Sequence, residues 1–179
     1  MIVDLGFEIL EIDISIYVRC EVIIAVYIDD MLIIDFNQEE CNKIYQALSQ
    51  YFQIENKEEV KSFLGLNITR NWEQHTISIN QPGYTDKLLA RFRMTNANST
   101  SFESGCELFN TTLDNNLCDS TIYQELTGSL NHLAVFSRPD IAFAVSKLSR
   151  FNNNPTVTHY KAGQHVLRYL KRTRNYCIT

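Results

Sequence analysis

The chain has 179 residues, of which 45% are hydrophobic, and a formal net charge of −5. This composition is typical of a globular protein and excludes an intrinsically disordered or collagen-like chain. The five cysteines include no C-x-x-C pair, which excludes a zinc knuckle and a dithiol redox motif. Because we find no signal peptide and no apolar run of membrane-spanning length, we expect a cytoplasmic protein without a membrane partner.

The charge is distributed unevenly along the chain. Residues 1–137 contain 8 Lys and Arg against 20 Asp and Glu, whereas residues 138–179 contain 8 Lys and Arg against Asp140 alone. A basic region on an acidic chain is either a phosphate-binding face or a solvated helix surface, and the charge alone favours neither.

The first predicted element is a β-hairpin. Residues 22–28 and 31–36 are apolar and rich in β-branched side chains, and Asp29 and Asp30 lie between them. This pattern predicts an antiparallel hairpin with both aspartates at or near its turn. The nearly continuous apolarity predicts burial on both faces, inside a larger sheet. The two carboxylates then lie either at an exposed tip, which the bare pattern favours, or beside a hard cation such as Mg²⁺.

The elements after the hairpin are mostly helical. Asn37 is expected to cap a helix that ends near Tyr51 and packs on the sheet. The order of hairpin, helix, second hairpin and further helices indicates an α+β fold. The remaining expected elements are strands at 62–69 and 76–80, a helix at 85–92, a loop at 96–120, and helices at 121–136, 139–151 and 159–172, the last capped by Thr158.

Several ordered blocks carry a family resemblance. Residues 27–32, Y-I-D-D-M-L, resemble the Y-x-D-D signature of reverse transcriptases, in the form typical of copia-type retrotransposons. Residues 63–70 resemble the family's F-L-G-x-x-I block, and residues 81–84 its S-Q-x-x-Y block. Residues 137–151, S-R-P-D-I-A-F-A-V-S-K-L-S-R-F, resemble its T-R-P-D-I-A stretch. Each block is weak alone, but together they are specific and extend over essentially the whole chain.

The resemblance implies an architecture. Residues 1–95 would form the C-terminal part of a polymerase palm, made of β-hairpins and a packing helix and including a primer-grip hairpin. Residues 96–120 would form a loop or linker, and residues 121–179 an all-helical, thumb-like region.

The resemblance also implies roles for particular residues. Asp29 and Asp30 would be catalytic and would bind Mg²⁺ or Mn²⁺, with Asp29 as the principal ligand. The residues implied to lie near the primer end are Tyr27, Met31, Phe63, Leu64 and Gly65. The residues implied to contact the nucleic-acid backbone are Lys147, Arg150, Lys161, Arg168, Lys171 and Arg172.

The same residues have plainer interpretations. Tyr27 is equally a candidate core aromatic, and residues 63–65 are candidates for an ordinary packed strand. Arg138 is more readily explained as part of a structural elbow in which it pairs with Asp140.

The function implied is that of part of an RNA-directed DNA polymerase from a retrotransposon Pol polyprotein. Its partners would be an RNA/DNA template–primer and deoxynucleoside triphosphates. The family's upstream metal-binding Asp, its fingers and its RNase H region are not recognisable among these residues, so we expect no activity from the chain alone. The alternative is a non-catalytic, nucleic-acid-binding remnant that uses the basic C-terminal helices.

Overall fold

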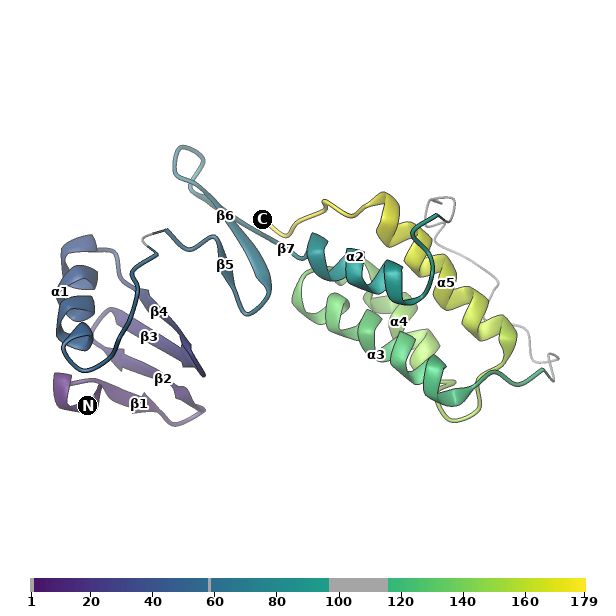
Figure 1. The fold of residues 1–179 in the computed structure, drawn as a ribbon, viewed down its shortest axis with the longest axis horizontal. Coiled ribbons are helices and arrows are strands. Elements are labelled where there is room, and N and C mark those ends of the chain that lie inside the picture. Colours follow the sequence, from purple (N-terminus) through teal and green to yellow (C-terminus); the bar gives the residue numbers. More distant parts are fainter. Residues whose placement is uncertain (1, 58, 97–115) are drawn as a thin grey trace. The chain divides into compact units, whose positions relative to one another are not determined.

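The computed structural model describes residues 2–57, 59–96 and 116–179. The expected loop at 96–120 therefore lies almost entirely outside the described residues. The described part combines antiparallel sheets with helices, which confirms the α+β fold (Figure 1). The chain divides into two compact units, Met1–Val60 and Lys61–Thr179. No helix in the described ranges is long and apolar enough to cross a bilayer.

The first unit is a four-stranded antiparallel sheet with one helix. The strands follow one another in chain order across the sheet. The two strands before the predicted hairpin were not expected from the sequence, although β2 alternates Ile14, Ile16 and Val18 with more polar residues at a period of two. The elements are the 3₁₀ turn η1 Val3–Leu5, β1 Glu8–Leu10, β2 Asp13–Arg19, β3 Val22–Tyr27, β4 Asp30–Ile34 and α1 Gln38–Ser49.

Helix α1 begins and packs as its sequence predicts. The Asn37 side chain accepts a hydrogen bond of 2.9 Å from the Glu39 amide, which satisfies one free N–H of the first turn. Ile44 and Leu48 on α1 are buried in one core with Val22 and Ile24 of β3. The predicted packing of this helix on the sheet is therefore confirmed, although the helix ends at Ser49 rather than near Tyr51.

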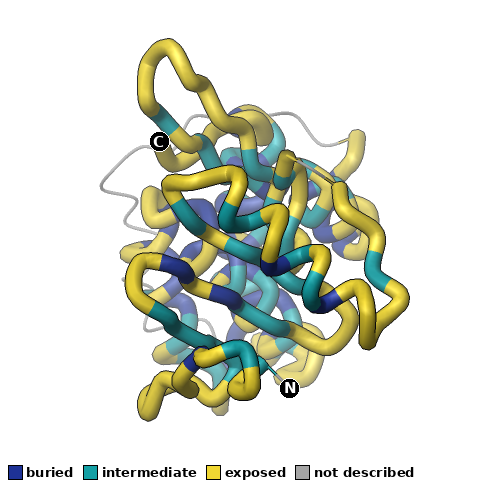
Figure 2. The backbone as a smooth tube through the Cα atoms, turned by 90° about the vertical axis from the view of Figure 1, so that its left-hand side faces the viewer, coloured by how far each residue is buried: buried dark blue, intermediate teal, exposed yellow. Residues whose placement is uncertain are grey.

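The prediction that the hairpin is buried on both faces is wrong. Side chains of a strand alternate between the two faces of the sheet. Only the side chains on the face toward α1 are buried in the core. On the other face, Ile23 is 38% exposed and its partner Ile34 is 47% exposed. In β3 the buried residues Val22 and Ile24 flank the exposed Ile23, and Figure 2 colours the backbone by this burial. An unbroken apolar run thus does not report how many faces of the sheet are covered.

The second unit begins with a three-stranded antiparallel sheet, β5 Ser62–Phe63, β6 Leu66–Asn71 and β7 Thr76–Asn80. The single strand expected at 62–69 is divided by a tight turn at Leu64 and Gly65, whose φ angles are +50° and +77°. Glycine adopts such angles readily, and its presence supports the reversal of the chain there. Near the C-terminus, Ile178 bridges to Ile79 through two backbone hydrogen bonds of 2.8 and 3.0 Å.

The helices of the second unit share one core. Thr156, not the expected Thr158, caps α5, and the His159 side chain completes a capping box. Side chains from three of the helices, including Leu126, Leu148 and Leu167, are fully buried in this core. The helices are α2 Pro82–Arg91, α3 Ser120–Phe136, the 3₁₀ turn η3 Pro139–Ile141, α4 Ala142–Ser149 and α5 Val157–Arg172.

The elbow predicted around Arg138 is confirmed. The Arg138 guanidinium is buried and donates to both carboxylate oxygens of Asp140, at 3.0 and 2.7 Å. It also donates to the carbonyl and hydroxyl oxygens of Thr173, just after α5. Tyr169 donates a third hydrogen bond to Asp140. Arg138 therefore ties the end of α3 to the end of α5, and it is not a surface cation.

Gly163 of α5 packs tightly against Leu126 of α3. A Cβ atom at this position would lie 2.6 Å from Cδ2 of the buried Leu126. We therefore expect Gly163→Ala to reduce the free energy of unfolding by about 1–3 kcal/mol, because the packed core has no room for the methyl group. Urea unfolding followed by circular dichroism measures this change.

Gly128 on α3 provides the matched control. Nothing lies within 4 Å of a Cβ built there, so Gly128→Ala should stabilise the helix by up to about 1 kcal/mol. Equal effects of the two substitutions would contradict the close contact between α3 and α5.

Candidate metal and nucleic-acid site

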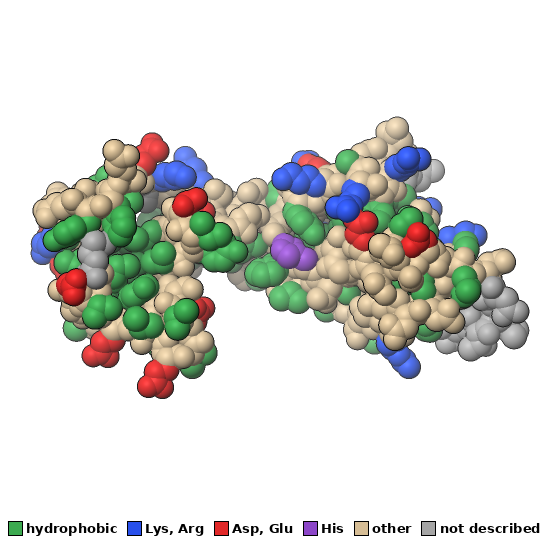
Figure 3. Space-filling view, turned by 60° about the horizontal axis from the view of Figure 1, so that its bottom comes forward, with side chains coloured by type: hydrophobic (Ala, Val, Ile, Leu, Met, Phe, Trp, Pro, Cys, Tyr) green, Lys and Arg blue, Asp and Glu red, His purple; other side chains and the backbone are tan. Residues whose placement is uncertain are grey.

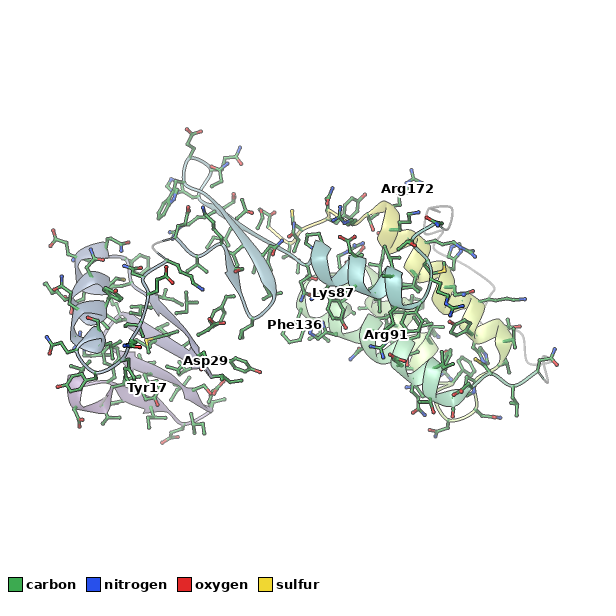
Figure 4. The ribbon with its side chains drawn as sticks, viewed as in Figure 1. Tyr17, Asp29, Lys87, Arg91, Phe136 and Arg172 are labelled. Atoms are coloured by element: carbon green, nitrogen blue, oxygen red, sulfur yellow. The ribbon has the colours of Figure 1, made fainter. Side chains whose placement is uncertain are left out.

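The two aspartates lie at the tip of the β3–β4 hairpin. Tyr27 pairs with Asp30, so the turn consists of Ile28 and Asp29, one residue earlier than the aspartate pair itself. This arrangement confirms the predicted hairpin with both aspartates at or near its turn. Both are exposed to solvent, and Figure 4 labels Asp29 at the end of the hairpin.

Ile28 adopts a strained backbone conformation in this turn. Its φ angle is +51°, a left-handed value that costs a β-branched residue roughly 1–2 kcal/mol. Strain of this kind is often found where a side chain must be held in a functional position. In this turn, the strained residue immediately precedes Asp29.

The aspartate pair offers oxygen ligands to a hard cation but does not enclose one. Within the described ranges, no group of three or more His, Cys, Asp and Glu side chains is placed to hold a metal ion. Mg²⁺ is commonly bound through one or two carboxylates together with waters and substrate phosphates. Asp29 and Asp30 therefore fit part of such a site.

Tyr27 and Met31 lie on opposite faces of the hairpin. Tyr27 is 53% exposed, so the alternative of a core aromatic is wrong. Met31 pairs with Val26, and both pack against the core beneath α1. Of these two, only Tyr27 presents a large exposed surface beside the aspartates.

The residues matched to the primer grip form a turn rather than a packed strand. Phe63 and Leu66 pair across the turn, and Leu64 at its tip is 45% exposed. A Cβ built on Gly65 meets nothing within 4 Å. This turn belongs to the second unit, whereas the aspartate hairpin belongs to the first.

The basic residues of the helical region divide between two helices. Lys147 and Arg150 lie on or just after α4. Lys161, Arg168 and Arg172 recur on α5 at intervals that place them on one helix face, and Lys171 is half-buried beside them. Within the part of the chain that the structure describes, Lys161, Arg168 and Arg172 form no ion pair. Figure 3 shows Lys and Arg spread over the helical unit, with some acidic side chains among them.

An aromatic cluster between α2 and α3 was not expected from the sequence. The His132 ring lies 4.7 Å from the ring centroids of both Tyr84 and Phe136. About two helical turns away on the same pair of helices, Arg91 of α2 pairs with Glu125 of α3. Figure 4 labels Phe136 at one end of these helices and Arg91 farther along them. Helical spacing on each helix separately could have suggested the cluster, but not that α2 and α3 would meet.

Comparison with known proteins identifies the family. Residues 1–103 match the model of the family described as reverse transcriptase (RNA-dependent DNA polymerase). The chain is 32% identical to the Retrovirus-related Pol polyprotein from transposon TNT 1-94 of Nicotiana tabacum, over 88% of this chain and 12% of that protein. It is 35% identical to the corresponding polyprotein from transposon RE1 of Arabidopsis thaliana, over 88% of this chain and 11% of that protein.

A shorter relative agrees with these matches. The chain is 34% identical to the putative transposon Ty5-1 protein of Saccharomyces cerevisiae, over 87% of this chain and 50% of that protein. The chain thus spans between about a tenth and a half of these relatives. No solved structure matches it. Because the family model covers more than half of the residues, the chain belongs to the reverse transcriptase (RNA-dependent DNA polymerase) family, in the copia-type branch of retrotransposon Pol polyproteins.

Proposed function

We propose that this chain is the part of a copia-type RNA-directed DNA polymerase that carries the aspartate hairpin, the primer grip and the thumb. The observation that carries this proposal is the position of Asp29 and Asp30 at the exposed tip of an apolar hairpin, inside the residues that match the family. The template–primer and the deoxynucleoside triphosphate would be its partners.

Asp29 and Asp30 would hold a divalent cation, Mg²⁺ or Mn²⁺, with Asp29 as the principal ligand. When bound, such a cation stabilises charge on a transferring phosphoryl group. The exposed ring of Tyr27 and the turn at Leu64 and Gly65 would position the primer end.

The proposed architecture is a partial palm in residues 1–95, a linker at 96–120 and a thumb in residues 121–179. The division of the chain into compact units at Val60 gives the F-L-G hairpin to the same unit as the helices.

We also propose that the 179 residues alone do not polymerise DNA. A second candidate function is then nucleic-acid binding without catalysis. The observation in its favour is the row of cations on α5 at Lys161, Arg168 and Arg172, since cations of this kind contact phosphates without reading sequence.

Binding of an RNA–DNA hybrid tests the nucleic-acid interface. A fluorescently labelled hybrid should bind at low salt, and its affinity should fall steeply as salt rises, because each phosphate contact releases counterions. Replacing Lys161, Arg168 and Arg172 by Gln should reduce the slope of log K against log salt by about 3, at roughly 0.9 per contact. Fluorescence anisotropy at several ionic strengths measures both quantities.

The control makes the same change of charge elsewhere. Replacing Lys43, Lys57 and Lys61 by Gln should leave that slope nearly unchanged. Absence of binding at low salt, or binding that does not depend on salt, would contradict the proposed interface.

A further inference from the structure

Phe143 is an exposed aromatic residue on α4, three of whose other apolar side chains are buried. It is 71% exposed, whereas Ala144, Val145 and Leu148 of α4 are buried in the helical core. Phe143 therefore does not support the core. Its ring is therefore accessible to a binding partner.

Two cations lie on the same side of α4 as this ring. The Lys147 ammonium is 5.4 Å from the centroid of the Phe143 ring, a cation–π contact. Arg150 follows about one turn later and is exposed, so the three residues span about 10 Å along the helix axis. Neither cation has a carboxylate partner in the described part of the chain.

The nearest acid in the sequence is already engaged. Asp140 accepts hydrogen bonds from Arg138 and Tyr169, so its charge is neutralised at the elbow. The face of Phe143, Lys147 and Arg150 is therefore basic and aromatic, with no acid of its own helix to compensate it. Its charge is complementary to a polyanion.

The ring decides which polyanion fits. Cations alone would bind the phosphates of a duplex and of a single strand equally well. An exposed ring face stacks on an unpaired base, but the bases of a duplex already stack on one another. We propose that Phe143, Lys147 and Arg150 bind single-stranded nucleic acid, with the Phe143 ring against an unpaired base and the two cations on neighbouring phosphates. This inference rests on the proposed function, because it assumes that the partner is nucleic acid.

The experiment compares a single strand with a hybrid. An octamer of deoxythymidine carrying one 2-aminopurine reports stacking by quenching of its fluorescence, and the labelled RNA–DNA hybrid reports duplex binding. For the full chain, Phe143→Leu should weaken binding of the octamer by roughly 5- to 160-fold and reduce the quenching, since stacking on an aromatic ring contributes about 1–3 kcal/mol per base. Phe143→Tyr should restore both, and the hybrid should bind all three proteins within about twofold.

Val135→Ala is the matched control, because Val135 of α3 is a 69% exposed apolar residue in the same unit. It should leave octamer binding unchanged. Equal octamer binding by the unaltered chain and Phe143→Leu, or no octamer binding by the unaltered chain, overturns the inference. If the hybrid still binds in a salt-dependent manner after either of these outcomes, the proposed function stands. If the hybrid does not bind, the proposed function itself is contradicted.

Discussion

Replacing Arg138 by alanine should lower the free energy of unfolding of the second unit by about 3 kcal/mol. Removing one partner of a buried ion pair typically costs about 3–5 kcal/mol, because the remaining groups lose their compensation. The Arg138 side chain is 4% exposed, whereas that of Asp140 is 34% exposed and can partly rehydrate, which favours the lower end of this range. The buried carbonyl of Thr173 would lose its hydrogen bond as well.

Two variants test the role of the guanidinium in this elbow. Arg138→Lys keeps the charge but loses the two-pronged contact with Asp140, so it should fall between the alanine variant and the unaltered chain. Arg150→Ala, at an exposed arginine, should stay within about 0.5 kcal/mol. Urea unfolding followed by circular dichroism gives all three values. Equal stability of Arg138→Ala and Arg150→Ala would refute the structural role of the elbow.

The elbow should also appear in the dependence of stability on pH. Burial alone raises the pKa of the Asp140 carboxyl, but hydrogen bonds from Arg138 and Tyr169 outweigh it and hold the pKa below its ordinary value. A carboxyl whose pKa is lowered by folding stabilises the fold at neutral pH, and this stabilisation is lost as the pH falls through the lowered pKa. As the pH falls below neutrality, the free energy of unfolding of Arg138→Ala should therefore decrease less than that of the unaltered chain.

The elements with strong local signals could be predicted from the sequence. The hairpin around Asp29 has two apolar runs and a polar turn, and α1 has a capping residue and an apolar face. The structure contains both the hairpin and the helix. Strands β1 and β2 were missed, although β2 pairs with β3 across the two-residue turn Cys20–Glu21 and therefore makes a local contact. The residues alone predicted an unbroken strand at Leu64, because leucine rarely adopts a positive φ angle, whereas the family resemblance implied a turn there.

The site residues show the same limit. Arg138 and Arg150 are both arginines in a basic stretch, but one is buried in an elbow and the other is exposed. Asp140, two residues after Arg138, suggested that Arg138 is paired. The hydrogen bond from Arg138 to the Thr173 carbonyl, 35 residues away, is visible only in the structure. Phe143 lies within a helical apolar pattern that predicts a core residue, and only the packing of α4 shows that its ring is exposed.

A polypeptide of these 179 residues should show no template-directed DNA synthesis with Mg²⁺ or Mn²⁺. Two ions about 3.5–4 Å apart need more carboxylates than Asp29 and Asp30, and the described residues hold no larger group that could supply them. The nucleotide must also be oriented against the primer, and orientation can supply roughly 7–11 kcal/mol of the barrier reduction. Nucleotide incorporation on a primed RNA template measures the activity.

The decisive comparison adds the upstream palm and fingers of a related Pol polyprotein to this chain. The extended protein should polymerise, and Asp29→Asn should reduce its rate by about a thousandfold, since losing a metal ligand costs several kcal/mol of transition-state stabilisation and each 1.36 kcal/mol is tenfold. Asp35→Asn is the matched control, because Asp35 is another acid of the same unit, after β4 and away from the turn, and it should leave the rate nearly unchanged. Robust synthesis by the 179 residues alone, abolished by Asp29→Asn, would show that the aspartate hairpin needs no further carboxylate. Synthesis by the extended protein that survives Asp29→Asn would instead remove Asp29 from the metal site.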